Sequence, residues 1–229
     1  MRRGAAAPGP RCAARLGCQV VQGYGLTETS PVTHAVPVER EENRPGSIGP
    51  PIPSTDCKVA DLLDGRALGP DEDGEVWIRG PQVMRGYLGD DEATARTLDD
   101  DGWLRTGDIG HADEDGWFYL VDRLKELIKV KGFQVAPAEL EAVLLDHPAV
   151  ADAAVVGSPD DEAGEVPKAF VVPAAGAELD VAELRSFVAA RVASYKQLRR
   201  VEVTDEIPKS ASGKILRRVL VERERASAS

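Results

Sequence analysis

The sequence has no long apolar run, and this sets a first limit on what the protein can be. No stretch approaches the roughly 18 uninterrupted apolar residues that a membrane-spanning helix requires. The basic start Met1–Arg3 is followed by Gly, Ala and Pro, which do not form the apolar core of a signal peptide. The sequence therefore predicts a soluble, cytoplasmic protein with no membrane span and no targeting segment.

Cysteines are scarce, and basic residues are outnumbered. Cys12, Cys18 and Cys57 are odd in number and lack the paired spacing of a zinc site or a redox motif, so we expect reduced thiols. The chain has 28 Lys and Arg against 39 Asp and Glu, a formal net charge of -11. Because general nucleic-acid or anionic-membrane binding needs a cationic face, no nucleic-acid partner is expected.

Histidines and clustered acids do not point to a metal site. His34, His111 and His147 are scattered without ligand spacing, and we expect structural or surface roles for them. The acidic run Asp99–Asp101 is expected to form a solvated turn rather than a metal cluster.

What is present is a globular chain whose two parts have different patterns. Its 229 residues are 42% hydrophobic, which is enough for a core. Residues 1–18 show no clear helix or strand period. Beyond them, alternating or aromatic runs such as Glu75–Arg79 and Trp117–Val121 are separated by Gly, Pro and Asp. We therefore predict a mostly β domain over residues 1–122.

Beyond residue 123, strands alternate with helices, which predicts an α+β domain over residues 123–229 with a boundary near Asp122–Lys125. The expected elements are hairpin strands 126–130 and 133–135 around Gly132, a helix from Pro137, strands 150–156 and 169–172, a helix capped by Asp180 and Glu183, strand 200–203, a polar loop 208–213 and a helix from Ile215.

Apolar stripes support the two inner helices of this domain. Leu140, Val143 and Leu144 share one face of the first helix. The stripe of the second helix consists of Leu184, Phe187, Val188 and Val192. The charged segment 217–225 is expected to be a helix that faces water.

The segment Gln22-Gly-Tyr-Gly-Leu-Thr-Glu28 combines two glycines, a hydroxyl and a carboxylate. Such a loop can bring its backbone close to a nucleotide, with Thr27 on phosphate and Glu28 on magnesium. A glycine turn with a solvated glutamate explains the same composition, and a short motif of this kind is weak evidence by itself.

Three further segments carry candidate chemistry. In Trp103-Leu-Arg-Thr-Gly-Asp108 the carboxylate can accept from two adjacent hydroxyls, although Thr-Gly-Asp is also a common turn. Val121–Pro137 can be a charged hairpin with long lysines. In Pro208-Lys-Ser-Ala-Ser-Gly-Lys-Ile215, Lys214 suits a reaction that builds negative charge, or it is a solvated loop lysine.

As full strings these segments closely resemble the signature motifs of the adenylate-forming superfamily, most closely those of acyl-CoA synthetases and 4-coumarate–CoA ligases. The resemblance is most specific over Val121–Pro137. It implies Glu28 as the ligand of Mg²⁺, and Asp108 with Arg123 at the ribose of ATP. The full set of implied nucleotide contacts is Gln22, Gly23, Tyr24, Thr27, Asp108, Arg123 and Gln134.

In the second domain the resemblance implies a hinge and two functional loops. The hinge residues are Asp122, Arg123 and Lys125. The implied contacts are Lys125 and Lys129 with the acyl-adenylate, and Lys131 and Gly132 with coenzyme A, while Lys214 and Lys129 are the implied catalytic lysines.

The reaction implied by the resemblance joins a carboxylic acid to coenzyme A in two steps. The acid and magnesium ATP first give an acyl-adenylate and pyrophosphate, with the Lys214 loop at the site. The small domain then turns about the hinge and brings the hairpin at Lys131–Gln134 to the adenylate for attack by the thiolate.

The family's phosphate loop and most of its acid-binding pocket have no counterpart in this sequence. We therefore expect a C-terminal remnant of the large AMP-binding domain, with a start that looks cut, followed by the small domain. Such a chain should have little activity alone because the substrates are no longer positioned, and a separate N-terminal half is a candidate partner. The alternative is a non-catalytic remnant that binds a nucleotide or a partner. The residues present leave the acid open.

Overall fold

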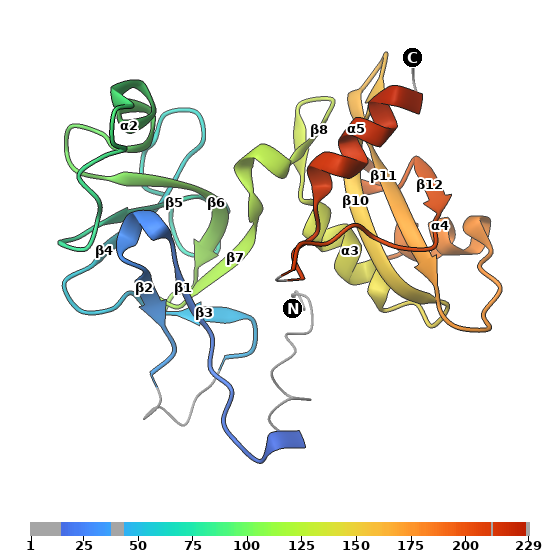
Figure 1. Cartoon of the computed structure of the whole chain (residues 1–229), viewed down its shortest axis with the longest axis horizontal. Helices are drawn as coiled ribbons and strands as arrows, with labels where there is room; N and C mark the ends of the chain where they lie inside the picture. Colours follow the sequence, from blue (N-terminus) through green and yellow to red (C-terminus); the bar gives the residue numbers. More distant parts are fainter. Residues whose placement is uncertain (1–14, 38–43, 212, 228–229) are drawn as a thin grey trace. The chain divides into compact units, whose positions relative to one another are not determined.

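The structure is a computed structural model that describes residues 15–37, 44–211 and 213–227. The chain divides into two compact units, Met1–Leu124 and Lys125–Ser229 (Figure 1). Strands and helices are mixed in the α+β class that the sequence predicts. No helix in the described part of the chain is long and apolar enough to cross a membrane.

The first unit is built mainly from antiparallel strands. A five-stranded sheet has the order β3-β7-β6-β5-β4, and β1 pairs with β2 beside it. The elements are β1 (Gly23–Gly25), η1 (Thr27–Thr29), β2 (Val32–Ala35), β3 (Ser47–Gly49), β4 (Asp56–Ala60), β5 (Gly74–Arg79), α2 (Asp91–Thr97), β6 (Leu104–Ala112) and β7 (Phe118–Arg123).

Alternation explains how β5 packs in this sheet. Val76 and Ile78 are fully buried in a cluster with Ile48, Val59 and Phe118, whereas the side chains between them point to the other face. The period-two pattern of the sequence therefore predicts this strand correctly.

Helix α2 was not expected from the sequence, and its composition explains why. None of its residues is buried, so it has no apolar stripe to reveal a helical period. Its start is fixed locally instead, because the Asp90 carboxylate accepts a hydrogen bond of 2.8 Å from the Ala93 amide. The acidic run that follows is a turn, as predicted, in which Asp99 accepts from the amides of Asp101 and Trp103.

The second unit is one mixed sheet with helices on both faces. The strand order is β10-β11-β8-β9, and β12 pairs parallel to β11. The elements are η2 (Leu124–Glu126), β8 (Ile128–Val130), β9 (Phe133–Val135), α3 (Pro137–Leu145), β10 (Val150–Asp160), β11 (Gly164–Pro173), α4 (Val181–Ala189), η3 (Ser194–Lys196), β12 (Arg200–Val203) and α5 (Arg217–Ser227).

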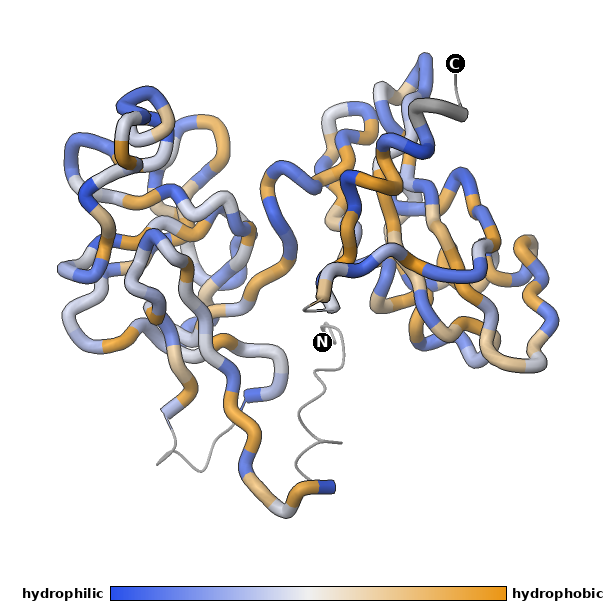
Figure 2. The backbone as a smooth tube through the Cα atoms, in the orientation of Figure 1, coloured by the Kyte–Doolittle hydropathy of each residue, from blue (hydrophilic) through white to orange (hydrophobic). Residues whose placement is uncertain are grey.

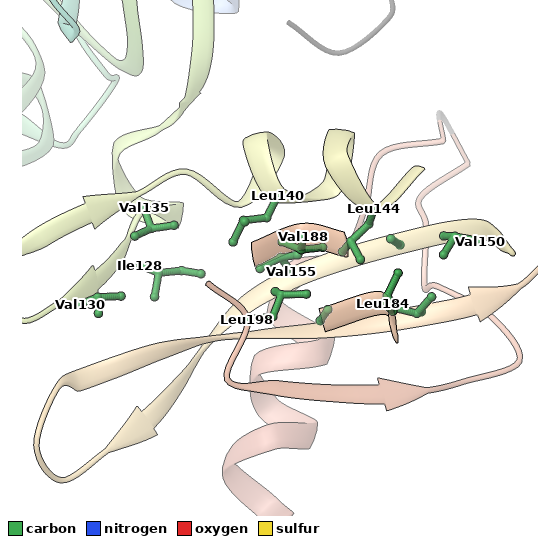
Figure 3. Close-up of a cluster of buried hydrophobic side chains, with 13 residues drawn as sticks. Ile128, Val130, Val135, Leu140, Leu144, Val150, Val155, Leu184, Val188 and Leu198 are labelled. Carbon is green, nitrogen blue, oxygen red and sulfur yellow. The ribbon is translucent and has the colours of Figure 1, made fainter. Parts of the chain in front are cut away.

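Helices α3 and α4 cover one face of this sheet and form the main core (Figure 3). Leu140 and Leu144 of α3 meet Leu184 and Val188 of α4, and all four are fully buried. This is the packing that the apolar stripes predict. Val192 packs against the same cluster, but it lies beyond the end of α4.

Helix α5 covers the opposite face, and the expectation that segment 217–225 faces water is wrong. Leu220 is buried among Ala154, Val156 and Phe170, and Glu224 is only 4% exposed. The helix starts at Arg217, two residues later than expected. A hydropathy pattern treats charged side chains as exposed. It therefore misses a helix face whose charged side chains are buried in ion pairs when the helix packs on the sheet.

Glu224 lies at the centre of a buried network of charged side chains between α5 and the sheet. Its carboxylate accepts a hydrogen bond of 2.5 Å from the Ser158 hydroxyl and pairs with Lys168, which also lies 2.8 Å from Glu202. Burial acts to raise the pKa of Glu224, but the bonds from Lys168 and Ser158 outweigh it, so the pKa lies below its usual value.

The three histidines have the structural or surface positions expected for them, and the two described cysteines are unpaired thiols. Cys12 lies outside the described residues, whereas Cys18 and Cys57 are free thiols. His34 is buried, and its burial lowers the pKa to about 4. His147 is buried edge-on against Phe187, and His111 pairs with Asp73.

We expect Glu224→Gln to lower the free energy of unfolding of the second unit by about 3 kcal/mol at neutral pH, because it removes one partner of a buried ion pair. The folded-state pKa of Glu224 is lowered, so its contribution is present above the unfolded value of 4.5 and is lost as pH falls through the folded value. The difference between the two proteins should therefore shrink in acid.

Hydrogen exchange of the β10 and β11 amides is the suitable measurement, because all three tryptophans lie in the first unit and report only on it. Glu222→Gln is the matched control, since this side chain on the same helix is 63% exposed. Equal losses in the two variants, or a difference that persists at strongly acidic pH, would contradict the prediction.

Candidate functional site

Two of the sequence motifs, far apart along the chain, line one pocket in the first unit. The pocket has a volume of about 430 Å³. Leu26 and Glu28 contribute to its wall from the first motif, and Thr106 and Gly107 contribute from the second. The fold therefore brings together the two segments that the sequence singles out for a nucleotide.

The first motif packs closely against the segment Pro31–His34, most tightly at Gly25. A Cβ atom on Gly25 would lie 1.6 Å from the Pro31 carbonyl oxygen, and one on Gly23 would lie 3.2 Å from the His34 oxygen. A close approach of the chain to itself is thus sufficient reason for Gly25. Beyond Gly25, hydrogen bonds between Leu26 and Thr29 close the short helix η1. The Thr27 side chain in this helix is exposed.

Glu28 lies half-buried at the pocket and is held by Tyr87. The Tyr87 hydroxyl donates to Glu28 Oε1 at 2.8 Å, and this bond is the main cause that raises the pKa of Tyr87. No cluster of three potential metal-binding side chains occurs among the described residues. One carboxylate with the neighbouring Thr27 hydroxyl fits Mg²⁺, which is commonly held by one or two carboxylates together with substrate phosphates.

Asp108 is the most buried of the candidate site residues that carry charge. It is 5% exposed on β6, directly opposite Arg123 on β7. Arg123 Nε lies 3.2 Å from Asp108 Oδ1, and the Tyr24 hydroxyl donates to Oδ2 at 2.5 Å. Each carboxylate oxygen keeps a second acceptor position, so the group can still accept hydrogen bonds from a ligand.

The protonation state of Tyr24 follows from this arrangement. Burial, and next the Asp108 carboxylate, raise the pKa of Tyr24 above its ordinary value. The phenol therefore stays a donor at neutral pH. Gln22, the first residue of the motif, is half-buried, and its carbonyl accepts from the Val36 amide at 3.1 Å.

A local hydrogen-bond network sets the backbone before Asp108. The Thr106 hydroxyl donates to the Val76 carbonyl at 2.7 Å and accepts from the Asp108 amide at 3.1 Å. Gly107, with a φ of 70°, donates its amide to Glu75 Oε1 at 2.8 Å. This left-handed backbone favours glycine, and the hydrogen bond that Gly107 donates to Glu75 fixes it.

Sequence reasoning missed Glu75 and Tyr87. Strand alternation was a usable signal for Glu75, since it places this residue on the face opposite Val76. For Tyr87 there was no such signal, because the residue meets Glu28 only through the tertiary fold.

In the second unit, β8 and β9 form the expected hairpin with its polar residues outward. Lys129 and Gln134 are exposed on the strands. Lys131 and Gly132 form the turn, with φ angles of 49° and 84°. Glycine adopts such positive angles without strain. The Lys131 amide donates to the Ala163 carbonyl at 2.9 Å, so the tip is fixed to the turn between β10 and β11.

The candidate catalytic lysine, Lys214, lies on a separate loop before α5 whose residues hydrogen-bond to one another; we call it the Lys214 loop. Lys214 is exposed, its carbonyl accepts from the Ser210 amide at 2.8 Å, and its own amide donates to Ser210 Oγ at 3.2 Å. In the same loop, Lys209 Nζ lies 2.5 Å from Asp152 at the start of β10.

The two loops of the second unit therefore lie at opposite ends of β10 (Figure 1). The Lys214 loop is anchored near Asp152, and the hairpin tip is anchored just beyond Asp160. At about 3.3 Å per residue, these ends are about 26 Å apart along the strand. Neither loop is buried.

The residues expected at a hinge lie where the two units join. Asp122 and Arg123 end β7, and exposed Lys125 is the first residue of the second unit. The connecting segment is mainly hydrophilic, with a hydrophobic position between its charged residues (Figure 2).

Comparison with known proteins identifies the family. Residues 4–88 match the model of the AMP-binding enzymes, and residues 139–214 match that of the AMP-binding enzyme C-terminal domain. The chain is 53% identical over 211 residues to 4-coumarate–CoA ligase-like 6 of Oryza sativa subsp. japonica. It is 49% identical over 203 residues to peroxisomal OPC-8:0-CoA ligase 1 of Arabidopsis thaliana. These matches cover 92% and 89% of this chain but only 35% and 37% of the two relatives.

Solved structures agree with this match. ATP-bound MatB from Rhodopseudomonas palustris superposes with a TM-score of 0.88 at 32% identity, covering 94% of this chain and 42% of that one. The o-succinylbenzoate–CoA synthetase of Bacillus subtilis, in complex with its acyl-adenylate intermediate, gives a TM-score of 0.80 at 37% identity, covering 92% and 42%. The chain belongs to the adenylate-forming family of AMP-binding enzymes.

Proposed function

We propose that this chain supplies part of an ATP-dependent ligase that activates a carboxylic acid as its acyl-adenylate and transfers the acyl group to coenzyme A. The observation that carries the proposal is the pocket shared by the motifs at Leu26–Glu28 and Thr106–Gly107, the second of which leads directly into Asp108, whose amide donates to the Thr106 hydroxyl. Relatives named as CoA ligases, and a related synthetase holding an acyl-adenylate, support the reaction class.

In the first unit, the ribose of ATP would bind Asp108 and Arg123, because a carboxylate can accept from both hydroxyls of a vicinal diol. Gln22, Gly23, Tyr24 and Thr27 would contact the rest of the nucleotide. Glu28 would hold Mg²⁺, which neutralises charge on the phosphates.

In the second unit, the two loops would serve the two half-reactions in turn. Lys214 would stabilise the charge that builds as the acid attacks the α-phosphate. After a rotation about residues 122–125, the hairpin would come to the site. Its proposed contacts are Lys125 and Lys129 with the acyl-adenylate, Gln134 with the nucleotide, and Lys131 and Gly132 with coenzyme A, while Lys129 is also a candidate catalytic residue.

The chain spans little more than a third of the length of the curated relatives it matches. We propose that catalysis requires an N-terminal half, with a separate chain as one candidate source, which would supply the phosphate loop and the acid pocket. The alternative is a non-catalytic remnant that binds a nucleotide or a partner. The cytoplasm is the proposed compartment, although one relative is named as peroxisomal.

Titration of this chain with AMP in a calorimeter tests the nucleotide site directly. We expect weak binding in the millimolar range, because only part of the proposed nucleotide site is present. Asp108→Asn should weaken it at least tenfold, because an amide offers fewer acceptor positions to the ribose. The matched control is Asp73→Asn, a carboxylate that pairs with His111 and belongs to none of the proposed nucleotide contacts. No heat at millimolar AMP would discard nucleotide binding by the isolated chain.

A crossed pair of variants tests the two loops in a complete enzyme, made by joining this chain to the N-terminal part of the rice relative. Lys214→Ala should slow adenylation by about 100-fold, equivalent to about 3 kcal/mol, through loss of one donor to the developing charge. Thioester formation from a preformed acyl-adenylate should change little.

Lys131→Ala should show the opposite pattern. ATP–pyrophosphate exchange reports the first step, and release of the acyl-CoA from added adenylate reports the second. A near-normal adenylation rate in Lys214→Ala would show that this lysine has been given the wrong role. No exchange with any aryl or fatty acid in the parent fusion would leave the ligase proposal unsupported.

A further inference from the structure

Arg217, the first residue of α5, makes contacts that the two half-reactions described above do not use. Its side chain is only 18% exposed, although it lies three residues after the exposed Lys214. Arg217 Nη2 donates to Glu141 Oε2 at 2.6 Å, and Nη1 lies 3.1 Å from Glu126 Oε2. One guanidinium is thus shared between two carboxylates from distant parts of the sequence.

These carboxylates belong to two different structural elements. Glu126 follows Lys125, the first residue of the second unit, and therefore lies beside the proposed pivot. Glu141 is buried on α3, and its Oε1 accepts from the Val155 amide of β10 at 2.8 Å. Arg217 therefore connects the start of the unit, the core strand β10 and the segment that carries Lys214.

The guanidinium is also strongly constrained. Its Nε is buried without a hydrogen-bond partner among the described residues, so its orientation is set by the two carboxylates on its outer nitrogens. The planar fork of arginine suits such a shared contact better than the single ammonium of lysine.

The backbone hydrogen bonds that join described residues of the Lys214 loop are local. Gly213 donates to the Ser210 carbonyl, and Leu216 donates to the Pro208 carbonyl. These bonds give the loop a shape, but they do not orient it with respect to residues 122–125. Ile215 packs on the sheet face that α5 covers and Lys209 pairs with Asp152, so both attach the loop to the sheet, whereas Arg217 joins it to Glu126 beside residues 122–125.

We propose that Arg217 is a positioning residue for the adenylation step, which holds the Lys214 loop in a fixed relation to Glu126 beside the pivot. A turn about residues 122–125 then carries Lys214 to the site as part of a rigid body. This inference rests on the proposed function. Arg217 acts through Lys214 and contacts no substrate.

The kinetic test uses the fusion enzyme and compares Arg217→Met with Arg218→Ala. Arg218 is the matched control because it is the adjacent residue, is 89% exposed and pairs along the helix with Glu222. A displacement of about 1 Å can cost about 100-fold in rate, so Arg217→Met should slow adenylation by about that factor. Transfer from preformed adenylate should stay within about threefold, and Arg217→Lys should restore only part of the loss.

Glu126→Gln keeps the test decisive where Arg217→Met does not fold. The Glu126 side chain is 25% exposed and its loss leaves the pair with Glu141 intact, so we expect about a tenfold slower adenylation. Equal losses in both half-reactions would indicate general damage and overturn the proposal. So would normal adenylation in both Arg217→Met and Glu126→Gln.

Hydrogen exchange on this chain alone separates the inference from the proposed function. The amides of Gly213, Lys214 and Leu216 should exchange at least tenfold faster in Arg217→Met and Glu126→Gln than in the parent chain. In Arg218→Ala their exchange rates should not change. Unchanged exchange in the first two variants would overturn the positioning role. An inactive parent fusion with the expected exchange pattern would reject the ligase proposal and leave the positioning of the loop standing.

Discussion

The length and rigidity of β10 determine what the second unit can do. This strand has 11 residues, pairs with β11 along most of them, and is packed between α3 on one face and α5 on the other. The Lys214 loop is anchored at one of its ends and the β8–β9 hairpin at the other. A packed strand does not shorten, so in the proposed reaction one active site would meet the two loops in succession.

In the first unit the corresponding constraint is the burial of an ionised carboxylate. Asp108 would be costly at its depth without compensation, and Tyr24 and Arg123 provide it from two other strands. The same bonds fix the direction of the carboxylate before any ligand arrives. The bonds that compensate the burial of Asp108 are therefore the same ones that would orient it in the proposed nucleotide site.

The sequence predicts the elements whose signal is local. Apolar periodicity identifies β5, β12 and the stripes of α3 and α4, and Gly132 marks the hairpin turn. Features that depend on distant partners are missed. Helix α2 has no buried face, Tyr87 reaches Glu28 only in the folded chain, and the buried side of α5 is rich in charge. The candidate site is predicted as separate strings, whereas their convergence on one pocket follows from the sheet.

The composition of α5 has a physical explanation. The helix is bound to the sheet by Leu220 near its middle and by ion pairs toward its ends, at Arg217 and Glu224. A purely apolar face would stabilise docking equally well, since buried ion pairs contribute little net stability after desolvation. Ion pairs do, however, disfavour any shifted register, because a shift would leave charges buried and unpaired. Helix α5 begins three residues after Lys214, so a fixed register of the helix also limits where Lys214 lies with respect to the sheet.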